Sequence, residues 1–117
     1  MTQLLEHDGD GVRLIGGYSP SSGHHHFPLA PVCPYSGADD VERVLLPTTG
    51  RLWAWTAVNT APPGYDGRVP YGFGVVELDD VALRVLGRLT ESDPDALHDG
   101  QLMRLIADLD VWAFTPA

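Results

Sequence analysis

Two glycine-terminated motifs constrain the fold of this chain more than any other feature of its sequence. They read SPSSG at residues 19–23 and CPYSG at residues 33–37. In each motif the first and fourth residues have the spacing of a pair of metal ligands, and a glycine follows the second of them. The four ligand positions are occupied by Ser19, Ser22, Cys33 and Ser36, so only one of them carries a thiol.

Such paired turns, joined by a short hairpin, are typical of a four-cysteine zinc ribbon. Zinc binds deprotonated thiolate or neutral imidazole, and a serine hydroxyl is too weak an acid to replace a thiolate. We therefore interpret residues 12–40 as a degenerate, metal-free, rubredoxin-like ribbon whose four ligand positions are relicts. The alternative is that both motifs are ordinary polar loops, since Ser, Pro and Gly are common in turns.

The triple histidine within the same segment offers another arrangement for metal. Imidazole is a good zinc ligand, and a site built from His24, His26 and Cys33 is chemically feasible. Neighbouring residues of an extended segment point to opposite faces, so only His24 and His26 can converge, and a fourth ligand is lacking. We favour solvated or partner-facing histidines and no bound metal.

Loss of the metal has an energetic consequence for this segment. A structural zinc contributes on the order of 10 kcal/mol to the folding of so small a module. Its one apolar stretch, Val12 to Ile15, is expected to end at Gly16 and Gly17, and it is too short to form a core. The segment is therefore expected to pack against the barrel or against another subunit, and to be poorly ordered in the isolated chain and fixed in a complex.

From residue 41 onward the chain consists of short apolar segments separated by turn residues. These segments are rich in β-branched and aromatic residues, which favour strands. The segments read VERVLL, RLWAWTAVNT, YGFGVVEL, ALRVLGRL, QLMRLIADL and VWAF. Five or so strands in roughly 75 residues are typical of a small closed barrel. The predicted fold is all-β, with the degenerate ribbon followed by a five-stranded OB-fold barrel over residues 41–117.

Other positions refine this prediction. Gly50 and Gly74 stand where a bulge or a sharp bend would let the sheet close. A helical turn is expected near residues 93–97, with Ser92 or Asp93 as N-cap and Pro94 at the first position. Strict alternation in RLWAWTAV places Trp53 and Trp55 on one face of a strand, and we expect that face to be buried against the core or the ribbon. If it points outwards, it marks an interface.

Charge and cysteine content limit the partners and the compartment. The net charge is -9, with sixteen acidic residues against seven basic residues, all of them arginine. Affinity for nucleic acid needs clustered positive side chains, so no nucleic-acid partner is expected.

The single cysteine precludes an intramolecular disulfide, and no apolar stretch is long enough to cross a bilayer. We expect a soluble, cytoplasmic protein with a short leader over residues 1–11 and no membrane partner.

Several pieces of the sequence occur in the order and spacing of a known family. They are SPSSG, FPLAPVCPYSG, GRLWAWTAV, APPGY, PYGFGVVELDD, LRVLGRL and a closing FTPA. From about Arg13 to its end the chain resembles the acyl-CoA-associated proteins in which a rubredoxin-like zinc ribbon precedes an OB-fold, found beside thiolases and related enzymes. It departs from that family in its lost cysteines and in a shortened N-terminal extension without a convincing helix.

The resemblance implies a function without catalytic residues. Proteins of that family bind a thiolase-like, aldolase-like or hydratase-like subunit, and their OB domain helps to form the site of the CoA thioester. We therefore expect a non-catalytic accessory subunit of a hetero-oligomeric, thiolase-type enzyme that forms or cleaves C–C bonds. It would share the CoA thioester as substrate, bind no cofactor tightly and have lost zinc. The alternative is a free-standing OB-fold module that binds acyl-CoA or another small ligand.

The residues themselves also lack a catalytic pattern. Acyl transfer needs a nucleophile beside a base, and donors for an oxyanion. Cys33 is the only thiol, and no lysine or arginine lies near it in sequence to lower its pKa.

The APPGY motif is the best candidate for contact with CoA or with the partner. Its two prolines stiffen the loop, and its glycine permits a left-handed backbone that would present Tyr65 at the tip. An ordinary loop with Tyr65 packed on the core is the alternative. Nearby arginines could bind phosphate or form surface ion pairs. The candidate contact residues are Arg51, Pro62, Pro63, Gly64, Tyr65, Arg68 and Tyr71.

Overall fold

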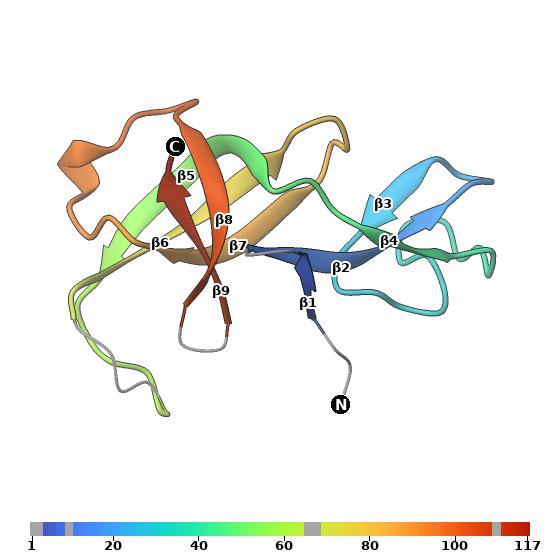
Figure 1. The fold of residues 1–117 in the computed structure, drawn as a ribbon, viewed down its shortest axis with the longest axis horizontal. Coiled ribbons are helices and arrows are strands. Elements are labelled where there is room, and N and C mark those ends of the chain that lie inside the picture. Colours follow the sequence, from blue (N-terminus) through green and yellow to red (C-terminus); the bar gives the residue numbers. More distant parts are fainter. Residues whose placement is uncertain (1–3, 9–10, 65–68, 109–110) are drawn as a thin grey trace.

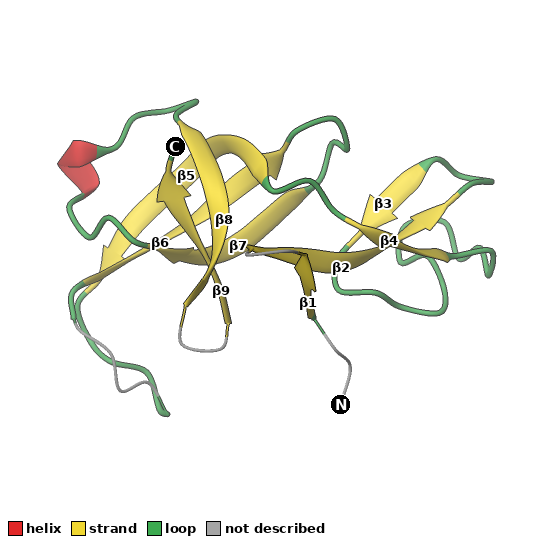
Figure 2. Cartoon of the chain, viewed as in Figure 1, coloured by secondary structure: helices red, strands yellow, loops and turns green. Residues whose placement is uncertain are grey.

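The computed structural model describes residues 4–8, 11–64, 69–108 and 111–117. Within these ranges the chain forms strands and one short 3-10 helix, and no α-helix (Figures 1 and 2). The all-β prediction is therefore confirmed. The elements are β1 (Leu5–Asp8), β2 (Gly11–Ser19), β3 (His24–His26), β4 (Glu42–Leu45), β5 (Thr49–Val58), β6 (Tyr71–Leu78), β7 (Arg84–Leu89), η1 (Pro94–Ala96), β8 (Leu102–Asp108) and β9 (Val111–Pro116).

Five strands close into a barrel in the order β5-β6-β7-β9-β8. All the pairs are antiparallel except that of β7 with β9, and β5 closes the barrel by pairing with both β6 and β8. Gly50 lies at this closure, because it pairs with Leu78 of β6 and with Met103 of β8. A Cβ at this position would collide with the backbone of Glu77. The barrel is an OB-fold, and Gly50 has the role that the sequence predicts.

A β-bulge in β5 separates the two tryptophans of this strand. The register of β5 against β6 shifts between Leu52 and Ala54, so Trp53 is the extra residue. Trp53 is 52% exposed, whereas Trp55 packs against the core opposite Gly74. The prediction that both indoles share a buried face is wrong, because a bulge reverses the alternation after it and leaves no signal in the apolar pattern.

The expected helical turn forms as η1, a 3-10 helix. Asp93 is its N-cap, and the Asp93 carboxylate accepts a hydrogen bond of 3.0 Å from the backbone N–H of Asp95. Pro94 occupies the first position, where a missing N–H costs nothing.

Among the described residues no helix has the length and apolar character needed to cross a membrane.

The remaining strands form a second sheet beside the barrel (Figure 1). The long strand β2 pairs with β1 at its start and with β3 and β4 further along. Part of the segment interpreted as a leader therefore belongs to this sheet as β1. Gly16 and Gly17 do not end the apolar segment as expected. They lie within β2, and glycine is required at both positions because a Cβ there would collide with the backbone carbonyl or the ring of His26 packed against them.

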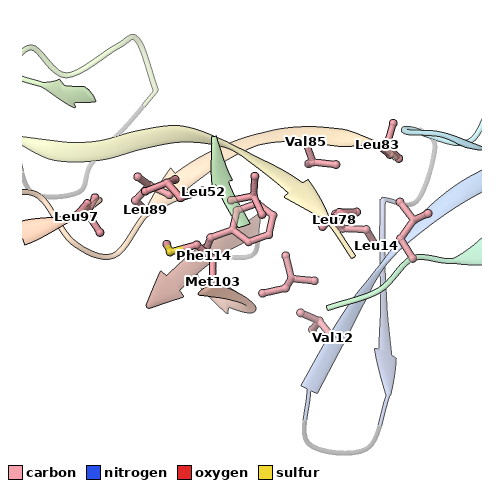
Figure 3. Close-up of a cluster of buried hydrophobic side chains, with 13 residues drawn as sticks. Val12, Leu14, Leu52, Leu78, Leu83, Val85, Leu89, Leu97, Met103 and Phe114 are labelled. Carbon is pink, nitrogen blue, oxygen red and sulfur yellow. The ribbon is translucent and has the colours of Figure 1, made fainter. Parts of the chain in front are cut away.

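One hydrophobic core joins the second sheet to the barrel (Figure 3). The second sheet and the segment after β4 contribute Val12, Leu14 and Leu46, and the last two are fully buried. Phe27 adds an edge-to-face contact with Trp112 of β9, at 5.3 Å between ring centroids. The segment before the barrel thus packs against the barrel, which is one of the two arrangements expected. The barrel contributes Leu52, Val76, Leu78, Leu83, Val85, Leu89, Leu97, Met103, Leu105 and Phe114.

This shared core predicts cooperative unfolding. Leu14→Ala should lower the free energy of unfolding by about 2–5 kcal/mol, because it leaves a cavity between the sheet and the barrel. Urea unfolding followed by both tryptophan fluorescence and circular dichroism should show a single transition. The control is Leu86→Ala at a barrel position that is 57% exposed, where a change of about 0.5 kcal/mol or less is expected. A separate early transition in Leu14→Ala, with the barrel unaffected, would contradict a common core.

Candidate functional site

The two glycine-terminated motifs form closely similar turns. In the first, the carbonyl of Ser19 accepts hydrogen bonds from the N–H groups of Ser22 and Gly23, at 3.2 and 2.7 Å. In the second, the carbonyl of Cys33 accepts one from the N–H of Gly37 at 2.9 Å. Both glycines adopt positive φ, 76° at Gly23 and 77° at Gly37, which side chains other than glycine rarely tolerate. Each ligand pair therefore lies on one tight turn.

The turns face each other through the side chains at the ligand positions. The Ser22 hydroxyl lies 3.9 Å from Cys33 Sγ, and Cys33 and Ser19 are almost completely buried. Hydrogen bonding to the Ser36 hydroxyl, with smaller contributions from backbone N–H groups and Ser22, lowers the pKa of Cys33. The relict-ligand interpretation requires this convergence of hydroxyls on the one thiol.

Asp40 stabilises the first turn, and the sequence analysis did not identify it. The Ser19 hydroxyl donates a hydrogen bond of 2.6 Å to one carboxylate oxygen of Asp40, and the backbone N–H of Ser21 donates one of 2.8 Å to the other. The bond from Ser19 is the main reason that the pKa of Asp40 is lowered. An aspartate in a loop gives no sequence signal of a partner twenty residues away, so only the structure reveals this contact.

The three histidines of β3 lie in different environments. His26 is 2% exposed, and its Nε2 accepts a hydrogen bond of 3.2 Å from the backbone N–H of Ala30. Its Nδ1 has no partner in the part of the chain that the structure describes. The ring of His24 lies 5.4 Å from that of Tyr35. Across the described residues, no three His, Cys, Asp or Glu side chains come together to hold a metal ion, so His24, His26 and Cys33 do not converge.

The structure does not gather the proposed CoA-contact residues into one compact site. The residues Pro62 to Gly64 are exposed in the loop after β5, and Gly64 has the left-handed φ of 83° expected there. Tyr71 begins β6 at the same end of the barrel. Arg51 pairs instead with Glu77, about 20 Å further along β6. Tyr65 and Arg68 lie outside the described residues.

Comparison with known proteins establishes the family. Residues 43–107 match the family model described as ChsH2, C-terminal OB-fold domain. A DUF35 domain-containing scaffold protein of Pyrococcus furiosus is 31% identical over 106 residues, which cover 91% of this chain and 76% of that protein. The chain belongs to the DUF35 family. A second DUF35 domain-containing scaffold protein, from Methanocaldococcus jannaschii, is 24% identical over 94 residues, covering 80% of this chain and 66% of that relative.

Solved structures of the DUF35 family show the same architecture. The Ltp2-ChsH2(DUF35) aldolase contains a chain that is 25% identical, with a TM-score of 0.69 over 89% of this chain and 84% of that one. A DUF35 protein of unknown function from Sulfolobus solfataricus matches with a TM-score of 0.62 and 11% identity over 90% of this chain and 76% of that one. At that identity the second likeness shows the fold alone. The resemblance drawn from the sequence pieces is confirmed for the family and for the OB-fold.

The relict-ligand interpretation predicts that cysteines restore metal binding to this DUF35 chain. The triple variant S19C/S22C/S36C should bind about one zinc per chain, because it completes a four-thiolate site on turns that already face each other. Elemental analysis of protein purified without nickel resin measures this. The control S19C/S21C/S36C has the same number of thiols and also removes the Ser19 hydroxyl, but it breaks the ligand spacing and should bind less than a tenth as tightly. A folded S19C/S22C/S36C protein without zinc would contradict the interpretation.

The contacts of Asp40 predict a pH-dependent contribution to stability. Because its pKa is lowered in the folded state, the ionised carboxylate stabilises the fold above the pKa of the unfolded chain, about 4, and this contribution is lost as the pH falls through the folded value. Asp40→Asn should therefore be less stable than the wild type at pH 7, with the difference shrinking below about pH 4. Urea unfolding across a pH series measures it. Asp39→Asn, at the exposed neighbouring position, is the control, and an equal loss there would show that Asp40 has no special role.

Proposed function

We propose that this chain is a non-catalytic accessory subunit that assembles with a catalytic subunit acting on acyl-CoA thioesters. The observation that carries the proposal is the likeness to a chain of the Ltp2-ChsH2(DUF35) aldolase, which extends over 89% of this chain and so includes both the ribbon region and the barrel. The description of two relatives as scaffold proteins supports a role in assembly.

The environment of the one thiol also supports a role without catalysis. Cys33 is 1% exposed, and its side-chain hydrogen-bond partners are the hydroxyls of Ser22 and Ser36. Neither hydroxyl is a base able to activate a nucleophile at neutral pH. The one buried histidine, His26, uses its unprotonated nitrogen to accept a hydrogen bond from the backbone. The catalytic groups would come from the partner.

The finer part of the proposal concerns the reaction and the substrate. The partner would be a thiolase-type subunit that forms or cleaves the bond between the α and β carbons of an acyl-CoA thioester. The solved relative is an aldolase, a class of enzyme that also forms and cleaves C–C bonds. We place the loop from Pro62 to Gly64 and the neighbouring Tyr71 at the CoA channel, because a stiff exposed loop loses little entropy on binding. The ribbon would work without zinc, and the free thiol suits the reducing cytoplasm.

Co-expression tests this proposal. The chain should co-elute in gel filtration with the acyl-CoA enzyme encoded beside it in the genome, in a fixed stoichiometry. C–C bond cleavage of an acyl-CoA substrate should be at least about tenfold faster with both subunits than with the partner alone. The chain alone should be inactive. A monomer that binds CoA by itself and retains no enzyme would contradict the proposal and favour the free-standing binding module.

A further inference from the structure

The outer face of strands β5, β6 and β7 exposes apolar side chains between arginines. Leu86 is 57% exposed, Trp53 52% and Phe73 37%, and exposed apolar side chains are informative where several of them adjoin. The strand register makes them neighbours, since Val75 pairs with Leu86 and Phe73 pairs with Arg88. We call this surface the outer patch and define it as Trp53, Phe73, Val75, Leu86, Arg84 and Arg88.

Strand alternation and two contacts of Arg84 hold the centre of the outer patch in place. Leu52 is buried, so alternation along β5 turns the next side chain, Trp53, away from the core. The Arg84 guanidinium lies 4.1 Å from the centre of the Trp53 ring, and its Nε donates a hydrogen bond of 3.0 Å to Glu77. Side chains ordered in advance lose less entropy on binding, and Trp and Arg are the residue types that dominate interface energies.

The outer patch is also basic, in contrast to the chain as a whole. The net charge of the chain is -9, yet β5, β6 and β7 together carry the three arginines Arg51, Arg84 and Arg88 and only one acidic residue, Glu77. An acidic surface is repelled by most of this chain and attracted to these strands.

We propose that the outer patch is the docking surface for the catalytic subunit, and that the subunit meets it with an apolar centre flanked by carboxylates. This inference rests on the function proposed above. The strands β6 and β7 are the second and third strands of the OB barrel, whose outer face is the common ligand-binding face of the fold. A single-stranded nucleic acid is a poor occupant, because two arginines in a chain of net charge -9 would release few counterions from a phosphate backbone.

Binding measurements with the co-purified catalytic subunit test the inference. Trp53→Ala combined with Leu86→Ala should raise the Kd at least about tenfold, and Arg84→Glu should do the same with a weaker salt dependence than the wild type. The control is Tyr35→Ala, which removes an aromatic side chain that is 62% exposed on the ribbon and should leave the Kd within about twofold. Circular dichroism and the Tm of each variant show whether it is folded.

A second measurement needs no variant. Hydroxyl-radical footprinting of the wild-type complex should show Trp53 and Leu86 protected from oxidation relative to the free chain, and Tyr35 unprotected. If the outer patch stays reactive in the complex, or its folded variants bind as tightly as the wild type, the inference is overturned while the proposed function stands. If the variants alter only self-association of this chain, a second copy occupies the patch and the inference is again overturned. If the wild-type chain binds no catalytic subunit, both proposals fail.

Discussion

Burial of Val12, Leu14 and Leu46 in the same core as the barrel residues is the interaction on which the rest of this structure depends. Each buried aliphatic side chain contributes about 1.5–3 kcal/mol, so three of them approach the contribution of a structural zinc, on the order of 10 kcal/mol. The ribbon region can therefore be ordered as part of the barrel's core. Its paired turns can keep their shape with hydroxyls in place of thiolates, and Asp40 holds the first turn through Ser19.

The inside and the outside of the barrel carry different kinds of side chain. Its inner face is filled by side chains from the strands of both sheets, which form one hydrophobic core. The bulge in β5 turns Trp55 towards the core, while Trp53 before it stays exposed on the outside of the barrel. Exposure of Trp53 beside the arginines of β7 agrees with the proposed role of this chain as a subunit that binds a catalytic partner.

Much of the fold and part of the candidate site could be predicted from the sequence, and the exceptions have common causes. The barrel strands, the Asp93 cap and the two turns are local features. Apolar alternation predicts the strands, Pro94 predicts the cap before it, and the glycines that end the two motifs predict the turns. The strand β1 was missed because four residues of mixed polarity form a strand only when β2 is present to pair with them. The two tryptophans were wrongly placed on one face because the bulge that turns Trp55 inward depends on the partner strand.

The sequence by itself determined the family, the all-β class, the positions of the tight turns and the acidic character of the chain, because these follow from composition and short-range spacing. Only the tertiary structure decided which surfaces those residues form. It joined the ribbon region to the barrel's core, paired Ser19 with Asp40, and gathered Trp53, Leu86 and two arginines, Arg84 and Arg88, on one face. Each of these depends on contacts between residues far apart in the chain, and local propensity carries no information about such contacts.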